Sequence, residues 1–173
     1  MLFLCSIMDK KTCLLIGRFQ PFHTGHYKVT NFLLSLFDEL KVGIGDIENN
    51  SFFTLEERVE MIKMLTPAKK VKIYSIKDLK PEDEFYNSWG RYVESAVGKF
   101  DFVAGGPDAR YLYTDFLSIN YPIIIFPKRF YKISGTLVRK RITDRDSSWE
   151  KYVTPDVKNI IRDSMFYKRR YQQ

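Results

Sequence analysis

Residues 12–26 read TCLLIGRFQPFHTGH, and both histidines of the chain, His23 and His26, lie in this stretch. Its apolar first part, Thr12 to Ile16, is typical of a buried strand, and the polar turn that follows leads into the first turn of a helix. Side chains three positions apart share one helix face, so we expect the two imidazoles to point the same way. Since the free N–H groups of a helix N-terminus attract anions, the stretch predicts a phosphate site after a strand.

Two small or rigid residues shape the same turn. Gly25 leaves no Cβ where a flat ring or a phosphate would lie against the backbone, and Pro21 fixes the loop that carries His23. Without these neighbours, two histidines in a loop would more often be surface residues or a helix cap.

A second polar segment, near the C-terminus, reads ISGTLVR at residues 133–139. By itself, the triplet Ser134-Gly135-Thr136 is typical of a helix N-cap. Arg139 follows shortly after, and further cations flank the segment, so a cradle for phosphate is the better interpretation.

Together the two segments resemble the signature motifs of the HxGH nucleotidyltransferase superfamily. Residues 17–26, GRFQPFHTGH, are similar to the first motif of archaeal-type nicotinamide mononucleotide adenylyltransferases, and residues 133–139 resemble the SxTxxR motif. Weaker similarities fall at residues 53–59, at Trp89 and at residues 105–107. The resemblance extends from Thr12 to about Arg162.

The resemblance implies an enzyme that transfers AMP from ATP to nicotinamide mononucleotide, giving NAD and pyrophosphate. It implies catalytic roles for His23, His26 and Arg139, with His26 nearest the transferred phosphoryl group. The residues implied in ATP binding are Gly17, Arg18, Phe19, Gly25, His26, Ser134, Gly135, Thr136 and Arg139. Those implied in binding the nicotinamide nucleotide are Gly105, Gly106 and Trp89, on which the ring would stack. Mg²⁺ is expected to be bound through the ATP phosphates and water, so no protein metal ligand is nominated.

Two departures from the archaeal pattern leave the acceptor open. The relatives usually carry S-G-N-P after the fourth strand, where this chain has Ala104-Gly105-Gly106-Pro107, and the loop at residues 45–51 is shorter and acidic. Both lie on the side expected to meet the second nucleotide. Nicotinate mononucleotide and phosphopantetheine are therefore alternatives, although Arg18-Phe19-Gln20 resembles the NAD-forming branch more than the T-F-D of other branches.

Strand-like and helix-like segments alternate along the chain, which predicts an α/β fold. The expected strands are Thr12 to Gly17, Glu39 to Ile44, Val71 to Ile76, Phe100 to Ala104 and Tyr121 to Phe126. The expected helices are an apolar repeat at Phe32, Leu33, Leu36, Phe37 and Leu40, segments with caps at Thr54, Ser134 and Thr154, and segments at residues 85–97 and after Asp108. We expect a single-domain, Rossmann-like, doubly wound parallel sheet of the nucleotidyltransferase type. Its ligand crevice lies at the carboxyl ends of the strands, which brings the motifs to one edge.

The composition, 45% apolar and 28% charged over 173 residues, is typical of one globular domain, and we expect a single nucleotidyltransferase domain over residues 1–173. No run approaches the ~18 apolar residues of a membrane span, so no membrane partner is expected. Residues 1–8 lack the basic start of a secretory signal. We expect this segment to be disordered, or the native protein to start at Met8. Cys5 and Cys13 have neither metal-binding nor disulfide spacing, and the cytoplasm is the expected location.

The net charge of the chain is +7, and the excess of cations lies in its C-terminal part. Residues 1–127 hold 15 Lys and Arg against 16 Asp and Glu, whereas residues 128–173 hold 13 against 5. One interpretation is a phosphate-facing cluster that would attract a triphosphate, formed by Lys128, Arg129, Lys132, Arg139, Lys140 and Arg141. The basic tail at residues 166–173 interleaves aromatics with cations, as single-strand binders do, so a nucleic-acid-binding module is the alternative of another class. Charge runs are more often solvated faces or frayed ends, so nucleic acid is not the expected partner. A homo-oligomer is expected, because the archaeal relatives often form hexamers.

Overall fold

A five-stranded parallel sheet forms the centre of the molecule. The computed structural model describes residues 10–46, 52–77, 88–106, 115–127 and 133–171. The strands are β1 (Thr12–Gly17), β2 (Glu39–Asp46), β3 (Val71–Lys77), β4 (Phe102–Gly105) and β5 (Ile123–Ile125), in the spatial order β3-β2-β1-β4-β5. All five predicted strands are confirmed, with bounds that differ by no more than two residues.

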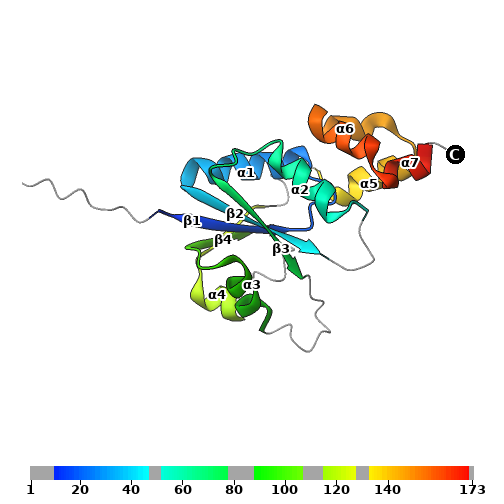
Figure 1. The fold of residues 1–173 in the computed structure, drawn as a ribbon. Helices are drawn as coiled ribbons and strands as arrows, with labels where there is room; N and C mark the ends of the chain where they lie inside the picture. The colour runs from blue at the N-terminus through cyan, green and yellow to red at the C-terminus, as the bar shows by residue number, and fades with distance from the viewer. Residues whose placement is uncertain (1–9, 47–51, 78–87, 107–114, 128–132, 172–173) are drawn as a thin grey trace, which may run out of the picture.

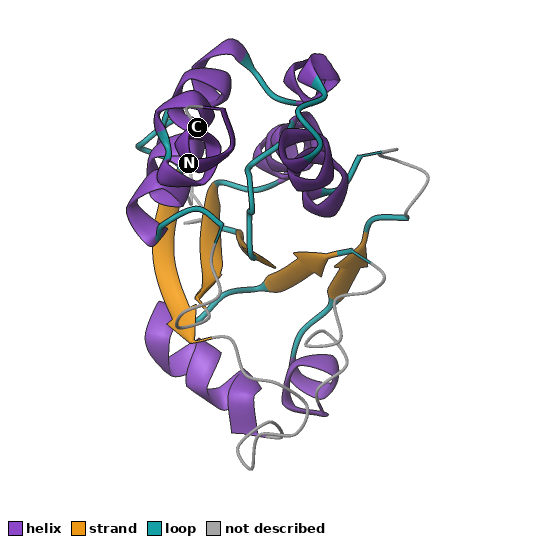
Figure 2. Ribbon diagram, turned by 90° about the vertical axis from the view of Figure 1, so that its right-hand side faces the viewer, coloured by secondary structure: helices purple, strands orange, loops and turns teal. Residues whose placement is uncertain are grey.

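Helices cover both faces of the sheet (Figure 1 and Figure 2), so the prediction of a doubly wound α/β fold is confirmed. On one face lie α1 (Thr24–Leu36) and α2 (Leu55–Lys63), and on the other lie α3 (Trp89–Val97) and α4 (Asp115–Asn120). The chain ends with α5 (Gly135–Thr143), the 3-10 helix η4 (Ser147–Tyr152), α6 (Pro155–Asp163) and α7 (Met165–Tyr171). Among these described helices, none is long and apolar enough to cross a membrane.

The alternation of side chains along β1 divides the core into two layers. Cys13 and Leu15 pack with α1, α2 and the C-terminal helices, whereas Leu14 and Ile16 pack with α3 and α4. All four side chains are at most 6% exposed. A strand that is buried on both faces is apolar at every position, which explains the run at the start of the first motif.

The predicted helix caps satisfy backbone groups that the first turn of a helix leaves unpaired. The confirmed caps are Thr54 for α2, Ser134 for α5 and Thr154 for α6. At α2 the cap is reciprocal, because Thr54 accepts from the Glu57 N–H and the Glu57 carboxylate accepts from the Thr54 N–H. The starts of these helices were therefore readable from local sequence.

The apolar series predicted for the first helix is only partly contained in it. The helix α1 ends at Leu36 with Phe37 as its C-cap, and Leu40 belongs to β2. Leu33 and Phe37 are buried, but Phe32 and Leu36 are 46% and 54% exposed. The predicted helical series therefore combined residues of two elements. Phe37 reaches the core from the cap of α1, and Leu40 reaches it from β2.

Residues 166–171 of the basic tail belong to α7 and are not a frayed end. Phe166 is buried, and the rings of Tyr167 and Tyr171 stack with centroids 4.2 Å apart. Tyr167 also lies edge-on to Trp149, which is buried in the core. These aromatic side chains are engaged in packing within the C-terminal helices, which weakens the case for a nucleic-acid-binding module.

The structure covers the expectations for the N-terminal end only in part. Residues 1–8, with Cys5, lie outside the described residues. Cys13 is buried on β1, and burial raises the pKa of its thiol to about 12. The thiol therefore stays protonated at neutral pH, and a protonated thiol is neither a good nucleophile nor a metal ligand.

Candidate active site

The strand order reverses between β1 and β4. From β1 the chain adds β2 and β3 on one side and then returns to add β4 and β5 on the other. In open α/β sheets such a reversal opens a crevice at the carboxyl ends of the strands. A cavity of about 600 Å³ lies there, with walls from β1, the start of α1, the turn after β4 and the start of α5. Its volume is in the ordinary range for a small-molecule site.

His23 and His26 form a reciprocal pair at the start of α1. The Nδ1 atom of each ring accepts a hydrogen bond from the backbone N–H of the other residue, both at 3.3 Å. The rings stack, with centroids 3.6 Å apart and planes 14° from parallel. This is a capping box in which imidazoles replace the usual hydroxyl and carboxylate. The histidines are thus a helix cap, and they also line the cavity.

The capping bonds determine where each ring carries its proton. A nitrogen that accepts a hydrogen bond has no proton, so each neutral imidazole is protonated on Nε2. Burial lowers the pKa of His23 to about 4. Burial, and then the neighbouring His23, lower the pKa of His26 well below its ordinary value. Both rings are therefore neutral near pH 7 and act as N–H donors, not as cations.

The depressed pKa of His23 is expected to make folding stability fall on acidification. The unfolded histidine binds its proton near pH 6.5, whereas the folded one does so only near pH 4. This contribution is fully present above about pH 6.5 and is lost as the pH falls toward 4, so that about 2.5 kcal/mol of stability is gone by about pH 4.5. His23→Asn keeps an acceptor for the cap but cannot titrate. Urea unfolding at neutral pH and at about pH 4.5 should therefore show a smaller loss in the variant, and equal losses would contradict this pKa.

Phe19 provides the apolar surroundings of His26. Its φ of 49° is left-handed and turns the ring back toward the end of β1. A Cβ on Gly17 would lie only 3.0 Å from this ring, so a side chain at that position would displace it. The Phe19 ring lies edge-on to His26 with centroids 5.0 Å apart, and Phe22 lies 5.5 Å from the same imidazole. Gly17 and Phe19 therefore act through shape and desolvation.

The start of α5 packs directly on the first motif. Arg139 Nη1 donates to the backbone oxygen of Gln20 at 2.6 Å, and Nη2 donates to Thr136 Oγ1 at 3.2 Å. A Cβ on Gly135 would lie 2.6 Å from the same Gln20 oxygen, so only glycine permits this approach. The two predicted phosphate segments are thus brought together at one edge of the sheet.

Most of the predicted site residues line the cavity. They are Gly17, Phe19, His23, Gly25, His26, Gly105, Gly106, Ser134 and Gly135. Thr136 and Arg139 lie on the same helix end as Ser134, outside the cavity wall itself. Burial, and next the charge of Arg18, lower the pKa of Arg139, so the two cations are close to each other. Their roles in binding stay predictions.

Trp89 lies apart from this cavity. It is the first residue of α3, it is 3% exposed, and its Nε1 donates to the backbone oxygen of Lys77 at 2.9 Å. Its ring belongs to the core layer that contains Ile16 and Ile76. The structure gives Trp89 a packing role at the carboxyl end of β3, and its stacking with a nicotinamide ring stays a prediction.

Gln20 and Arg58 hold the first motif in place, although the motif comparison gives neither a role. The side-chain amide of Gln20 pairs with the backbone N–H and carbonyl of Phe53 at 2.9 and 3.4 Å. Arg58 is fully buried and donates to the backbone oxygens of Arg18, Gly45 and Thr54. One feature of the sequence could have identified Arg58. It lies three and four positions before the apolar Met61 and Ile62, so the helical pattern places this cation on the core face of α2.

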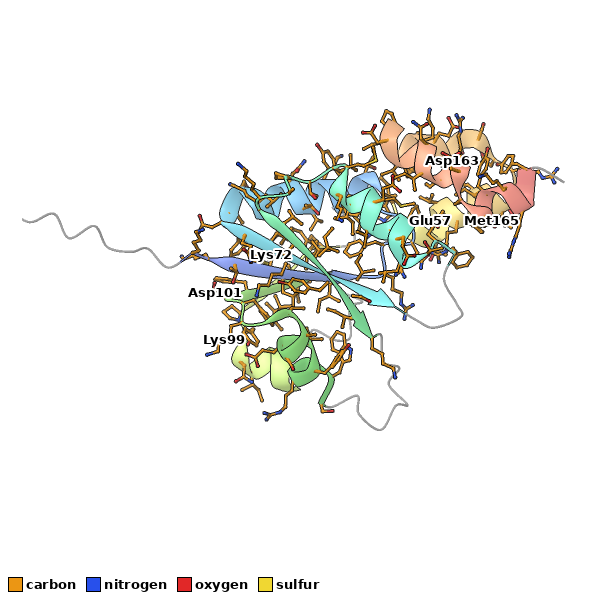
Figure 3. All side chains as sticks on the ribbon, viewed as in Figure 1. Glu57, Lys72, Lys99, Asp101, Asp163 and Met165 are labelled. Carbon is orange, nitrogen blue, oxygen red and sulfur yellow. The ribbon has the colours of Figure 1, made fainter. Side chains whose placement is uncertain are left out.

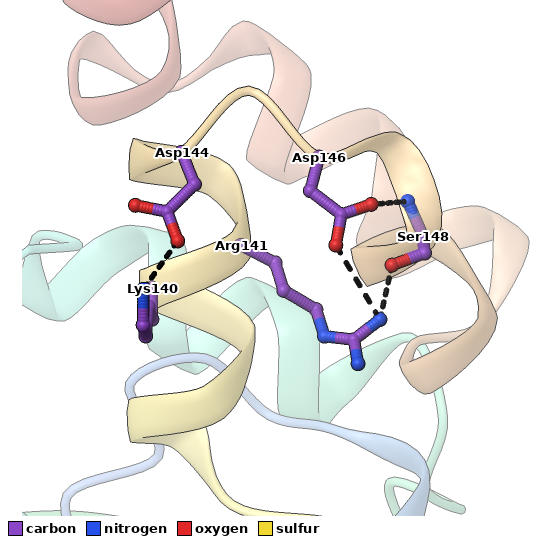
Figure 4. A network of polar contacts seen from close by, with 5 residues as sticks. All are labelled: Lys140, Arg141, Asp144, Asp146 and Ser148. Atoms are coloured by element: carbon purple, nitrogen blue, oxygen red, sulfur yellow. Dashed lines mark hydrogen bonds and ion pairs between the residues drawn. The ribbon is translucent and has the colours of Figure 1, made fainter.

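Lys140 and Arg141 do not join the phosphate cluster that the charge pattern predicts. Figure 4 shows them paired among the C-terminal helices. Lys140 Nζ lies 2.5 Å from Asp144, while Arg141 lies 3.6 Å from Asp146 and also donates to Ser148. Residues one and two positions after Arg139 project from other sides of the helix, which explains the separation. The other predicted cations, at positions 128, 129 and 132, lie outside the described residues.

The fold and the site together define a class of protein. A parallel sheet with a strand-order reversal, two helix N-termini at one cavity, and neutral imidazoles on the cavity wall are suited to hold the phosphates of a nucleotide. The class is that of α/β proteins that bind nucleotides at the switch point of the sheet.

The chain belongs to the cytidylyltransferase-like family, whose family model matches residues 14–141. It is 36% identical over 160 residues to the nicotinamide-nucleotide adenylyltransferase of Thermococcus onnurineus, which covers 88% of this chain and 83% of that protein. A protein of the same name from Methanocorpusculum labreanum is 36% identical over 155 residues, covering 86% of this chain and 88% of the relative.

Solved structures of related proteins share the fold. A bifunctional NMN adenylyltransferase/ADP ribose pyrophosphatase from Francisella tularensis, complexed with AMP and a Mn ion, matches with a TM-score of 0.70 at 22% identity. The match covers 92% of this chain and 51% of that one, so this chain spans about half its length. Plasmodium falciparum nicotinic acid mononucleotide adenylyltransferase matches with a TM-score of 0.59 at 16% identity, covering 91% and 97%. At these identities the likeness supports the fold alone.

Proposed function

We propose that this protein transfers the AMP group of ATP to nicotinamide mononucleotide, forming NAD and pyrophosphate. The observation that carries the proposal is the pair of stacked, neutral imidazoles at the N-terminus of α1, in a cavity shared with the N-terminus of α5. The relatives that are 36% identical bear the name of this activity.

In the proposed reaction an oxygen of the acceptor phosphate attacks the α-phosphorus of ATP. The new P–O bond forms while the bond from the α-phosphorus to the bridging oxygen breaks, and pyrophosphate leaves with that electron pair. The nucleophile is already an anion, so no general base is needed, and the protein contributes position and charge stabilisation. A cavity wall whose described residues include imidazoles and glycines but no carboxylate is consistent with this chemistry.

In this proposal the two motifs bind different parts of the triphosphate. His23 and His26 donate to phosphate oxygens, with His26 nearest the transferred phosphoryl group. Arg139 binds the β- and γ-phosphates, and its guanidinium is the strongest donor of the second motif. The residues that complete the ATP site are Ser134, Gly135 and Thr136 at the start of α5, and Gly17, Arg18, Phe19 and Gly25 in the first motif.

Mg²⁺ enters the proposed reaction as part of the substrate, Mg-ATP. Within the described ranges, no group of three or more His, Cys, Asp or Glu side chains is placed to hold a metal ion. The cavity instead presents N–H donors, which suit phosphate oxygens. The ion is then held by phosphates and water, as Mg²⁺ often is in nucleotide sites.

The acceptor is proposed to bind beside Gly105 and Gly106, which line the cavity at the end of β4. Among the described residues, a Cβ on Gly106 would meet nothing within 4 Å, so this position faces open space. The departures at Ala104 and Gly106 lie in the described residues, whereas the altered loop at residues 47–51 lies outside them. Nicotinate mononucleotide and phosphopantetheine are the alternative acceptors. The cytoplasmic location and the homo-oligomer stay predictions.

Pyrophosphate release tests the proposal directly. The protein is supplied with Mg-ATP and, in parallel, with nicotinamide mononucleotide, nicotinate mononucleotide or phosphopantetheine. We expect turnover with nicotinamide mononucleotide, at a kcat/KM above that of the other two acceptors. Faster turnover with either of the others would replace the acceptor. The absence of turnover with all three, with ATP still bound, would reject NAD formation and leave a nucleotide-binding protein with a different acceptor.

A further inference from the structure

Arg139 is held on three sides, and the third is an aromatic ring that no motif predicts. The Gln20 backbone oxygen and Thr136 Oγ1 accept two of its N–H bonds, and the guanidinium carbon lies 4.5 Å from the centre of the Phe52 ring. The Phe52 ring is 44% exposed, although it lies against other side chains. Stacking on a cation explains why an aromatic side chain occupies a partly exposed position.

The Phe52 ring is itself held in place by the core. It lies edge-on to Phe166 of α7, with centroids 5.1 Å apart, and Phe166 is 8% exposed. The next residue, Phe53, is fully buried, contacts Phe166 as well, and is paired through its backbone with the Gln20 amide. Figure 3 shows Glu57 of α2 and Met165 of α7 at this same end of the molecule, opposite Lys72 and Asp101. Gln20 therefore fixes both the ring and the carbonyl that contact Arg139.

Stacking suits a guanidinium that has to bind phosphate. A ring covers the flat face of the group and leaves its N–H edge free for oxygens, whereas an ion pair would occupy that edge. The nearby charge of Arg18 repels Arg139, and a flexible side chain would otherwise move away from it. A triphosphate site needs cations close together, and the ring offsets the repulsion between them.

We propose that Phe52 is a positioning residue for Arg139. Its ring, backed by Phe166, holds the guanidinium in the orientation that meets the β- and γ-phosphates of ATP. The inference rests on the proposed function, in which Arg139 binds these phosphates. It also gives α7 a link to the site, since Phe166 on α7 supports the ring.

Calorimetric titration with ATP and with AMP tests the inference, because AMP lacks the phosphates that Arg139 binds. Phe52→Leu is expected to weaken ATP about fivefold, the effect of losing one partly exposed cation–π contact, and to leave AMP unchanged. Phe52→Tyr keeps the ring and should restore the ATP affinity. In an Arg139→Ala background, Phe52→Leu should have no further effect on ATP, because the contact is already absent.

Phe32→Leu is the matched control. Phe32 is 46% exposed, close to the value for Phe52, and its ring lies edge-on to Phe126. Its ratio of ATP to AMP affinity should equal that of the wild type. Equal weakening of ATP and AMP by Phe52→Leu, or a further fivefold loss in the Arg139→Ala background, would overturn the inference. If Arg139→Ala alone leaves ATP affinity unchanged, the arginine role in the proposed function fails, and the inference falls with it.

Discussion

His26→Ala is expected to lower kcat about 10²-fold or more while the KM for ATP changes only a few-fold. The reason lies in the timing of the charge. Negative charge on the transferred phosphoryl group and its leaving oxygen redistributes in the transition state, and a donor fixed beforehand stabilises that state more than bound ATP. His26 is such a donor, because its ring is partly buried, neutral and oriented by the His23 cap. Steady-state rates of pyrophosphate release across a range of ATP concentrations separate the two parameters.

Two further substitutions at position 26 separate catalysis from capping. Glutamine places an amide N–H where His26 has Nε2, whereas asparagine places its oxygen where Nδ1 accepts from the His23 N–H. We expect His26→Gln to retain more of kcat than either His26→Ala or His26→Asn, and His26→Asn to retain more stability than His26→Ala. A normal kcat in His26→Ala would remove His26 from the proposed mechanism.

Much of the fold could be predicted because its signals are local. The β1 run is apolar at every position since both faces of the strand are buried, and the caps at Thr54, Ser134 and Thr154 are each set by residues within one helical turn. The common edge of the motifs also follows from the sequence, because parallel strands place all their carboxyl ends on one side.

The parts of the site that could not be predicted depend on contacts between distant segments. That His23 and His26 are neutral follows from their burial, to which the Phe19 and Phe22 rings beside His26 contribute, and a spacing of three residues does not specify these contacts. The charge count treats Lys140 and Arg141 like Arg139, but acidic partners on later turns pair with the first two. The position of Arg58 on the core face of α2 is visible in the sequence, but its acceptors on β2 and in the loop after β1 are not.

Arg58→Met is expected to lower the free energy of unfolding by about 3 kcal/mol. The guanidinium of Arg58 is fully buried and donates to Thr54 O at 3.2 Å, to Arg18 O at 3.2 Å and to Gly45 O at 2.9 Å. These carbonyls belong to the start of α2, the loop after β1 and the end of β2, which no backbone ladder joins at this point. Methionine fills the volume of the side-chain stem but donates nothing, so buried oxygens lose their partner.

Thermal and urea unfolding measure the effect of the Arg58 substitution, which corresponds to a midpoint lower by roughly 6–12 °C for a domain of this size. Lys63→Met removes an exposed cation from the same helix and should change stability by less than about 0.5 kcal/mol, so the comparison separates burial from charge. Because the Arg18 carbonyl adjoins Phe19, the variant should also bind ATP less tightly at temperatures where it is still folded. A variant as stable as the wild type would mean that the three carbonyls are satisfied without Arg58, and the first motif would then owe its position to Gln20 and the start of α5 alone.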